Sequence, residues 1–303
     1  MNSKIYKYMS PGHLDKVIGT KGHVTLKCSK PEDFNDPYEL FLTIDFNQDP
    51  GVLAFYKDVI GDLPQLPTTC FSRLPTVIPM WAHYGQNSQG ICLEFDEERL
   101  VEKFPEIKLV DVEYRDTPED HSELLGLAFQ IGKYRHVALL QHALFRSAYY
   151  TKTTCWSYEE ERRLVVGDKY IRKQDDLLLM DVPSDCVTAL ICGPRASSDT
   201  KTAVQDKAEQ LGCNYYECRT GRSSAVPYFV NLRGEPALFD GQKIAAITQS
   251  CTSCLEPIGN GGDLCSWCQI DESHRQDAAS RNSLRLLASM GLLQEYMAGF
   301  GRK

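Results

Sequence analysis

The sequence lacks any apolar run approaching the roughly 20 residues that a helix needs to span a bilayer. Its N-terminal segment, MNSKIYKYMSPGHLDK, also lacks the continuous apolar stretch that marks a secretory signal. Both absences argue against a membrane protein and against a secreted one. We therefore expect a cytoplasmic location and no membrane partner.

The chain also has fewer positively charged residues than negatively charged ones. The chain carries 33 Lys and Arg against 41 Asp and Glu, a formal net charge of −8. Phosphate contacts come from cations, so this balance excludes a protein held on nucleic acid by bulk electrostatics and leaves only local basic grooves. Internal repeats and low-complexity tracts are missing too. The 303 residues suffice for one large domain with an appendage.

Cysteine, by contrast, is abundant, with 12 in the chain. A disulfide framework is typical of small secreted domains, which this sequence does not resemble, and buried free thiols explain most of the cysteines. Cys251, Cys254, Cys265 and Cys268 differ, because they form two CxxC pairs separated by LEPIGNGGDL. Four thiolates satisfy tetrahedral Zn²⁺ and leave no coordination position open. The pattern predicts a structural zinc ribbon without a catalytic role.

The zinc ribbon itself is poor in cations. Between Gln249 and Glu272 there is no Lys or Arg, while several acidic residues are present. Because phosphate contacts need cations, we interpret the ribbon as a structural or protein-docking element.

Three regions are expected: an α+β domain over residues 1–245, the zinc ribbon over 246–272 and an amphipathic C-terminal helix over 273–303. The C-terminal helix is predicted from apolar residues at near-helical spacing: Leu284, Leu287, Met290, Leu293 and Met297. This helix could pack on the main domain or bind a partner, such as an antitoxin or a regulatory protein.

Within the main domain, strand and helix patterns mix without the strict alternation of a doubly wound sheet, which favours the α+β class. An apolar stripe from about Glu119 to Tyr150 predicts one or two packed helices. A later helix should end near Leu211, with Ser197, Ser198 or Asp199 as its N-cap. Strands are expected, among others, at 90–95, 163–166, 177–181, 187–192, 215–219 and 228–232.

The segment KTTCWSYEEERRLVV, residues 152–166, is the most informative part of the chain. An aromatic-rich turn leads into three glutamates, two arginines and an apolar run typical of a buried strand. Adjacent carboxylates repel one another and lose solvation beside a core strand. Arg162 and Arg163 could compensate for this repulsion by forming a solvated salt-bridge cluster with the glutamates. Alternatively, the turn delivers Glu159 and Glu161 to the edge of a cleft.

Several separated motifs, in order, resemble a widespread bacterial family of uncharacterised domains. They are YKY at 6–8, FNDPYE at 34–39, FS at 71–72, MWAHYG at 80–85, GICLEF at 90–95 and WSYEEERR at 156–163. The resemblance covers roughly residues 4–232 and leaves out the zinc ribbon. The arrangement is also similar to the ADP-ribosyltransferase fold, which implies a split mixed sheet with flanking helices and NAD⁺ as a substrate.

That second resemblance implies a role for each matching residue. On the first strand, Tyr6, Lys7 and Tyr8 would meet the adenosine ribose or phosphates; Lys7 stands where many members of that group carry His or Arg. Ser72, His83 and Tyr84 would border the nicotinamide. Glu161 would contact the nicotinamide ribose, with Glu159 as the preceding acid of an ExE motif. Asn35 and Asp36 would line the cleft, and Trp81 or Tyr84 would stack on the nicotinamide ring.

The chemistry requires these residue types. Breaking the bond between nicotinamide and ribose builds an oxocarbenium-like cation, which a fixed carboxylate such as Glu161 stabilises. Glu159, with a pKa raised by Glu161, could activate the nucleophile of a nucleic-acid or protein acceptor. The sequence therefore favours an NAD⁺-dependent enzyme that modifies a macromolecule, such as a toxin or an anti-phage effector.

Other interpretations stay open at this stage. Trp81 and Trp156 could be core aromatics, His83 a satisfied histidine, and Asn35-Asp36-Pro37 a plain turn. The cleft could belong to a recognition module that binds nucleic acid or protein without catalysis. A metal-dependent nuclease would instead use carboxylates as divalent-cation ligands: Asp36, Glu39, Glu159 and Glu161.

Overall fold

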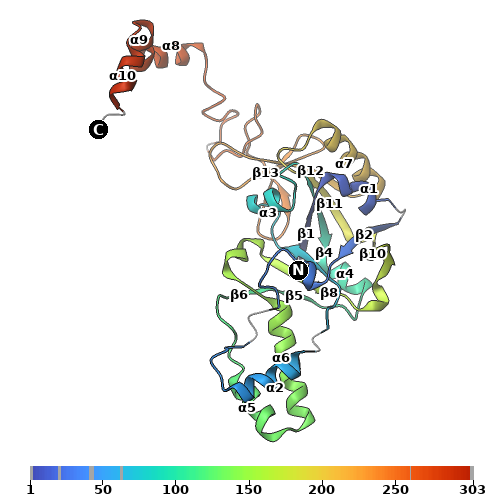
Figure 1. Ribbon diagram of the computed structural model, residues 1–303. Helices are drawn as coiled ribbons and strands as arrows, with labels where there is room; N and C mark the ends of the chain where they lie inside the picture. The colour runs from blue at the N-terminus through green and yellow to red at the C-terminus, as the bar shows by residue number, and fades with distance from the viewer. Residues whose placement is uncertain (1–2, 20–21, 41–43, 62–63, 260, 301–303) are drawn as a thin grey trace. The chain divides into compact units, whose positions relative to one another are not determined.

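The computed structural model describes residues 3–19, 22–40, 44–61, 64–259 and 261–300 (Figure 1). The chain divides into two compact units, Met1–Ala246 and Ile247–Lys303. Each unit is described by itself.

A mixed sheet forms the centre of the first unit, with ten strands in the part of the chain described. Across the sheet these are β15 (Ile244–Ala246), β14 (Pro236–Phe239), β13 (Tyr228–Asn231), β12 (Asn214–Arg219), β11 (Val187–Cys192), β4 (Ile91–Asp96), β1 (Lys4–Met9), β3 (Thr68–Ser72), β8 (Glu161–Val165) and β5 (Leu109–Asp111).

One crossover shapes this sheet. Strands β11 and β12 pair in parallel, joined by helix α7 (Ser198–Leu211), while the neighbouring pairs from β11 through β4, β1, β3 and β8 to β5 are antiparallel. Ser197 caps α7, and its hydroxyl accepts from the Thr200 amide at 3.1 Å. The predicted cap is therefore confirmed, and so is the mixed α+β class.

Two smaller sheets accompany the large one. One has the order β2 (His23–Cys28), β10 (Leu177–Pro183) and β9 (Arg172–Gln174), and the other pairs β6 (Glu113–Tyr114) with β7 (Thr151–Lys152). Sequence patterns predicted β10 but missed β9, β14 and β15, which have three or four residues each. Strands this short carry too little alternation to be recognised.

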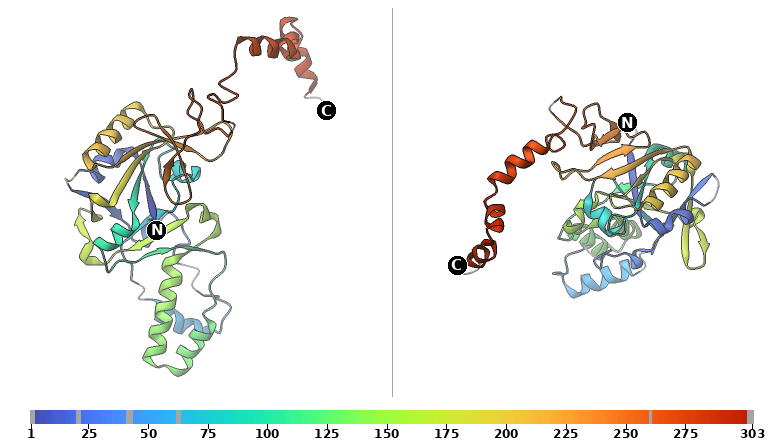
Figure 2. Two further views of the ribbon diagram at one scale, coloured as in Figure 1. Left: turned by 180° about the vertical axis from the view of Figure 1, so that it is seen from behind. Right: turned by 90° about the horizontal axis from the view of Figure 1, so that it is seen from above.

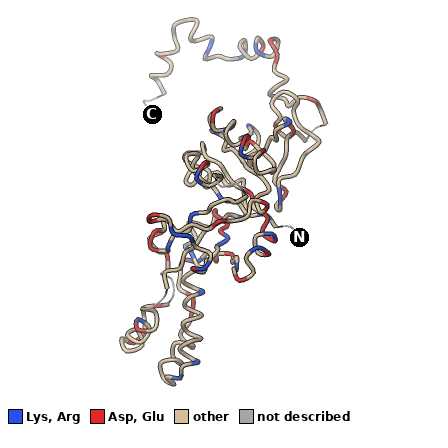
Figure 3. The backbone as a smooth tube through the Cα atoms, turned by 90° about the vertical axis from the view of Figure 1, so that its right-hand side faces the viewer, with Lys and Arg blue, Asp and Glu red and all other residues tan. Residues whose placement is uncertain are grey.

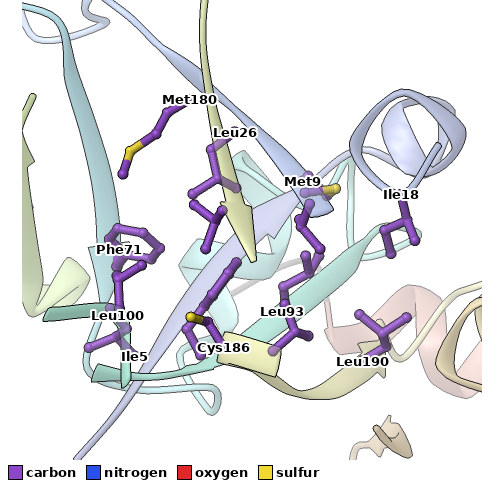
Figure 4. Packing of buried hydrophobic residues seen from close by; sticks show 14 of the residues in the cluster. Ile5, Met9, Ile18, Leu26, Phe71, Leu93, Leu100, Met180, Cys186 and Leu190 are labelled. Carbon is purple, nitrogen blue, oxygen red and sulfur yellow. The ribbon is translucent and has the colours of Figure 1, made fainter. Parts of the chain in front are cut away.

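The main core fills the space between the large sheet and the β2–β10 pair. Ile5, Leu93 and Leu190 project into it from three neighbouring strands, opposite Leu26 and Met180 (Figure 4). All five side chains are buried. Helices α1 (Leu14–Val17), α4 (Glu97–Lys103) and α7 also contribute residues to this cluster. A second cluster around Trp81, in helix α3 (Ile78–His83), involves residues of β1 and of strands β11 to β15.

Helices α2 (Pro50–Ile60), α5 (Ser122–Ile131) and α6 (Tyr134–Tyr150) form a third cluster and stay together in every view (Figure 2). The sequence predicts one or two helices from about 119 to 150, and the structure has two, with a break where Gly132 takes a φ of 61°. The apolar stripe is only partly internal. Leu140 and Leu144 are fully buried, whereas Leu127, Ile131 and Leu139 are exposed.

The second unit holds the two CxxC pairs in irregular backbone, followed by three short helices, α8 (Glu272–Arg281), α9 (Ser283–Ser289) and α10 (Leu293–Phe300). In its described part, the segment predicted as an amphipathic C-terminal helix, 273–303, consists of these three helices. Asn282 leaves the helical region to cap α9, and Gly291 takes a φ of 75° before α10. Residues 301–303 lie outside the described part of the chain.

None of the helices in the described ranges is long and apolar enough to cross a membrane.

Candidate active site

Three of the predicted site residues lie at matching positions on neighbouring strands. Tyr6 on β1 pairs with Ser72 on β3, and Ser72 pairs with Glu161 on β8. Directly paired residues of antiparallel strands carry their side chains on the same face. The fold therefore aligns Tyr6, Ser72 and Glu161 in a row across three strands, although they are far apart in the sequence.

The sheet opens beside this row. β1 and β3 share a single paired position, Tyr6 with Ser72, whereas β1 pairs with β4 along its whole length. Where β1 and β3 diverge, the Lys7 ammonium donates to the Cys70 carbonyl at 2.8 Å and to the Thr69 hydroxyl at 2.9 Å. A side chain thus bonds to the β3 backbone in place of a continued ladder, and the strands stay apart.

A cavity of about 320 Å³ lies at this opening. Its lining includes most of the residues predicted from the sequence: Tyr6, Lys7, Tyr8, Asn35, Ser72, Tyr84, Glu159 and Glu161. Its charged lining residues are nearly balanced, with Lys7, Lys27, Lys152 and Arg163 against Asp33, Glu159 and Glu161. Mixed charge is typical of the whole first unit, where blue and red positions intersperse along the chain (Figure 3).

The turn before β8 separates the three consecutive glutamates. A 3-10 helix, Thr154–Glu159, ends at Glu160, which takes a φ of 42° in the left-handed region and is exposed. Glu159 and Glu161 on either side are buried at the cavity. The Ser72 hydroxyl donates to the Glu159 carbonyl at 2.7 Å. Ser72 therefore holds the turn that presents Glu159.

A chain of hydrogen bonds leads from the surface into the cavity. The side-chain amide of Asn35 donates to the Tyr84 hydroxyl at 3.0 Å, and that hydroxyl donates to Glu159 Oε1 at 2.6 Å. The Lys152 ammonium donates to Glu159 Oε2 at 2.7 Å and reaches Glu161 Oε2 at 3.4 Å. Lys152 thus lies between the two carboxylates.

Glu161 is held from its other side by Arg163. The fully buried guanidinium donates from Nε to Glu161 Oε1 at 2.7 Å and from Nη2 to Oε2 at 3.0 Å. Its Nη1 pairs with Glu39 and donates to the Tyr149 carbonyl at 2.8 Å. This two-point contact fixes the plane of the Glu161 carboxylate.

These contacts and burial shift the pKa values of the two carboxyl groups in opposite directions. Burial disfavours the charge on Glu161, but the combined attraction of Arg163 and Lys152 outweighs it and lowers its pKa to about 2. For Glu159 burial prevails over Lys152 and Tyr84, and its pKa is raised above the ordinary value. Neighbouring acids with separated pKa values are typical of sites that need one ionised and one protonatable carboxyl.

Some predicted site residues do not reach the cavity. Trp81 is fully buried, donates from Nε1 to the Pro75 carbonyl at 2.9 Å and packs edge-on against Tyr8 at 4.9 Å. It is a core residue and has no free ring face for a ligand. His83 is exposed outside the lining and meets the Tyr158 ring edge-on at 6.1 Å.

Others reach the cavity or its vicinity in a different role. The Tyr6 hydroxyl donates to Glu94 at 3.0 Å and that of Tyr8 to the Leu74 carbonyl at 2.7 Å, so both phenols are engaged inside the protein. Asp36 is buried away from the lining, and its Oδ1 accepts from the Tyr38 amide at 2.9 Å. That contact favours the turn interpretation of Asn35-Asp36-Pro37.

Sequence reasoning missed two cations of the site, Lys152 and Arg163. Of the two alternatives for this segment, the solvated salt-bridge cluster is wrong for Arg163, because its side chain is fully buried. Strand periodicity held the signal, since residues two apart on β8 share a face and Glu161 therefore faces the same way as Arg163. The approach of Lys152 depends on the turn between β7 and β8, which no local pattern reveals.

The structure brings together the four cysteines of the predicted zinc ribbon. The Sγ atoms of Cys251, Cys254, Cys265 and Cys268 all lie within 4.8 Å of one another. The 3.8 Å between Cys254 and Cys265 matches the edge of a tetrahedron with Zn–S bonds of about 2.3 Å. The four thiols are positioned to hold a metal ion and are compatible with structural zinc. In the described part of the chain, the carboxylates of the nuclease hypothesis form no such group.

No curated protein and no solved structure matches the chain. The segment from α3 to β8, which carries the MWAHYG, GICLEF and WSYEEERR motifs, does resemble a known family. A family model described as "Protein of unknown function (DUF2971)" matches residues 80–164.

Proposed function

We propose that the first unit is an NAD⁺-dependent enzyme of the ADP-ribosyltransferase type, which transfers ADP-ribose to a nucleic acid or a protein. The observation that carries the proposal is the row of Tyr6, Ser72 and Glu161 across three strands, beside a cavity at an opening in the sheet. The fold resemblance implies this arrangement for residues of these types.

Glu161 is suited to stabilise developing positive charge. Its carboxylate is ionised over the whole physiological pH range, since its pKa is about 2, and Arg163 fixes its orientation. A carboxylate oxygen offers more than one lone pair, so pairing with Arg163 leaves acceptor capacity. In a buried cavity this preorganised charge stabilises the oxocarbenium-like ribose as nicotinamide departs.

Glu159 is suited to move a proton. Its raised pKa brings the carboxyl closer to neutral pH, and the Tyr84 hydroxyl and Lys152 ammonium hold its two oxygens. As a general base, Glu159 would take the proton of the attacking hydroxyl or amine of the acceptor. The nucleophile would then form its bond to C1 of the ribose as the bond to nicotinamide breaks.

The rest of NAD⁺ would meet cations at the opening. A volume of about 320 Å³ is at the low end of small-molecule sites, roughly 300–1,000 Å³, and suits the nicotinamide riboside half. Lys7 is half-buried in the lining and Lys27 is exposed beside it. Both can contact the pyrophosphate as point charges.

The experiment compares NAD⁺ binding and nicotinamide release for wild type, Glu161→Gln and Lys7→Met. We expect Lys7→Met to weaken NAD⁺ binding about tenfold, the value of one lost charge-assisted contact of about 1.4 kcal/mol. Glu161→Gln should keep binding within a few fold and lose nicotinamide release. Lys169→Met is the matched control, because Lys169 is exposed and pairs with Glu106 outside the cavity lining.

Failure to bind NAD⁺ at millimolar concentration by folded wild-type protein would overturn the proposal. Binding of a nucleic acid or protein that Glu161→Gln leaves unchanged, without NAD⁺ turnover, would identify a recognition module instead.

A further inference from the structure

A second cavity, of about 530 Å³, lies between helix α2 and residues that include Glu32, Glu39 and Ile44. Its wall is largely apolar, with Leu40, Ile44, Phe46, Tyr56 and Ile60 among the lining residues. Phe46 and Tyr56 meet edge-on at 6.2 Å, and Phe46 is 69 % exposed. This cavity shares no lining residue with the one at the β1–β3 opening.

A buried carboxylate, that of Glu39, forms part of the wall of this apolar cavity. Glu39 lines it, and only 3 % of the Glu39 side chain is exposed. Its Oε1 accepts from Arg163, while its Oε2 has no hydrogen-bond partner among the described residues. A buried carboxylate oxygen is costly to leave unsatisfied, so such an atom at a cavity wall indicates a missing donor.

The charges of the lining specify what kind of donor fits. Glu32 also lines the cavity; its side chain is 61 % exposed and pairs with Lys30, which is outside the lining, at 3.6 Å. Among the described lining residues there is no Lys, Arg or His. The cavity therefore offers two carboxylates, an apolar wall and two aromatic rings. An ammonium group attached to an apolar body matches all three, because carboxylates and aromatic faces both attract cations.

We propose that this cavity is a binding site for a small organic ammonium compound, whose cation pairs with Glu39 Oε2 and whose apolar body packs against Ile44, Phe46 and Tyr56. This binding proposal does not require that the first cavity bind NAD⁺.

The two cavities are connected through one side chain. Arg163 pairs with Glu39 by Nη1 and with Glu161 by Nε and Nη2. A cation at Glu39 Oε2 shares that carboxylate with Arg163, which holds Oε1, and so weakens the attraction between Arg163 and Glu39. Arg163 can then interact more strongly with Glu161, so binding in the second cavity changes the electrostatic environment of Glu161 in the first.

The test uses 4-fluorobenzylammonium as the probe, observed by ¹⁹F NMR on the full-length protein. 4-Fluorobenzyl alcohol serves as the neutral probe of nearly the same shape. We expect wild type to bind the ammonium probe at least tenfold more tightly than the alcohol, the size of one charge-assisted contact. Glu39→Gln should remove this preference, while Arg163 keeps Glu161 as its partner.

Two further variants keep the test decisive. Asp36→Asn alters another buried carboxylate with an unpartnered oxygen, which does not line this cavity, and should bind the probe like wild type. Ile60→Trp fills the cavity from a half-buried position, leaves Glu39 unchanged and should abolish binding. Binding that Ile60→Trp leaves intact, equal affinity for the alcohol, or no binding to wild type at all would each overturn the proposal.

Discussion

Replacing Arg163 by Met tests the buried charge network on which the candidate site is built. The Arg163 side chain is fully buried and neutralises Glu39 and Glu161 together. In the variant Glu161 retains Lys152, but Glu39 loses the cation at its Oε1. Removing one partner of a buried ion pair costs about 3–5 kcal/mol, because a charge stays behind in a poorly solvated place.

The neighbouring residue provides a matched control. Arg162 points to the other face of β8 and pairs with Glu97 and Asp111. Both of these carboxylates also pair with Arg73, at 2.9 Å each. Arg162→Met therefore leaves no acid without a cation, and we expect it to cost clearly less than Arg163→Met.

Urea unfolding followed by near-ultraviolet circular dichroism measures both changes. With a slope of about 3 kcal/mol/M, Arg163→Met should lower the midpoint by about 1–2 M. Adding Glu39→Gln should recover part of this loss, since the two positions are in direct contact. A cost for Arg163→Met no larger than that for Arg162→Met would show that the buried pairs of Arg163 do not stabilise the fold.

Three further outcomes are expected. The pKa of Glu161 is lowered to about 2, so the stability that Glu161 contributes is present above about pH 4.5 and is lost as the pH falls toward 2. In acid unfolding curves, Glu161→Gln should therefore lose less stability than wild type between these two pH values. Metal analysis should find about one zinc per chain, which Cys254→Ser lowers and Cys213→Ser, outside the four-cysteine group, does not. Gly132→Ala should destabilise by about 1–2 kcal/mol because Gly132 has a φ of 61°, whereas Gly126→Ala, within α5 and with open space at its Cβ position, should stabilise by about 0.5–1 kcal/mol in thermal unfolding.

The elements that the sequence predicted well are those with strong local signals. The β4 and β11 segments, ICLEFD and VTALIC, are rich in apolar residues, Ser197 is a typical N-cap, and two CxxC pairs indicate a metal site by spacing alone. Each of these signals depends on a few adjacent residues, so it does not depend on the rest of the fold.

The site could be predicted only in part, because its central contacts are long-range. The motifs singled out Ser72, Tyr84, Glu159 and Glu161, and the structure places these four residues in the lining of one cavity. Nothing local shows that the Tyr6 hydroxyl is bonded to Glu94 inside the protein. Likewise, the fully buried position of Trp81 follows from packing against distant strands and not from its own segment.

The same limit explains the most consequential correction. Two arginines after three glutamates suggest surface ion pairs, which is the commonest outcome for such a run. The alternation of side chains along β8 points Arg163 into the protein. There it pairs with Glu39, which comes from a segment far away in the sequence. The charge is retained inside the protein because two carboxylates meet it there.

The most direct test of the proposed function is incubation of NAD⁺ labelled in its adenylate half with the purified protein and a bacterial lysate, for wild type and Glu161→Gln. We expect transfer of the label to nucleic acid or protein with wild type and none with Glu161→Gln, at comparable folding of both proteins. Equal labelling with both, or no consumption of NAD⁺ by either, would contradict it.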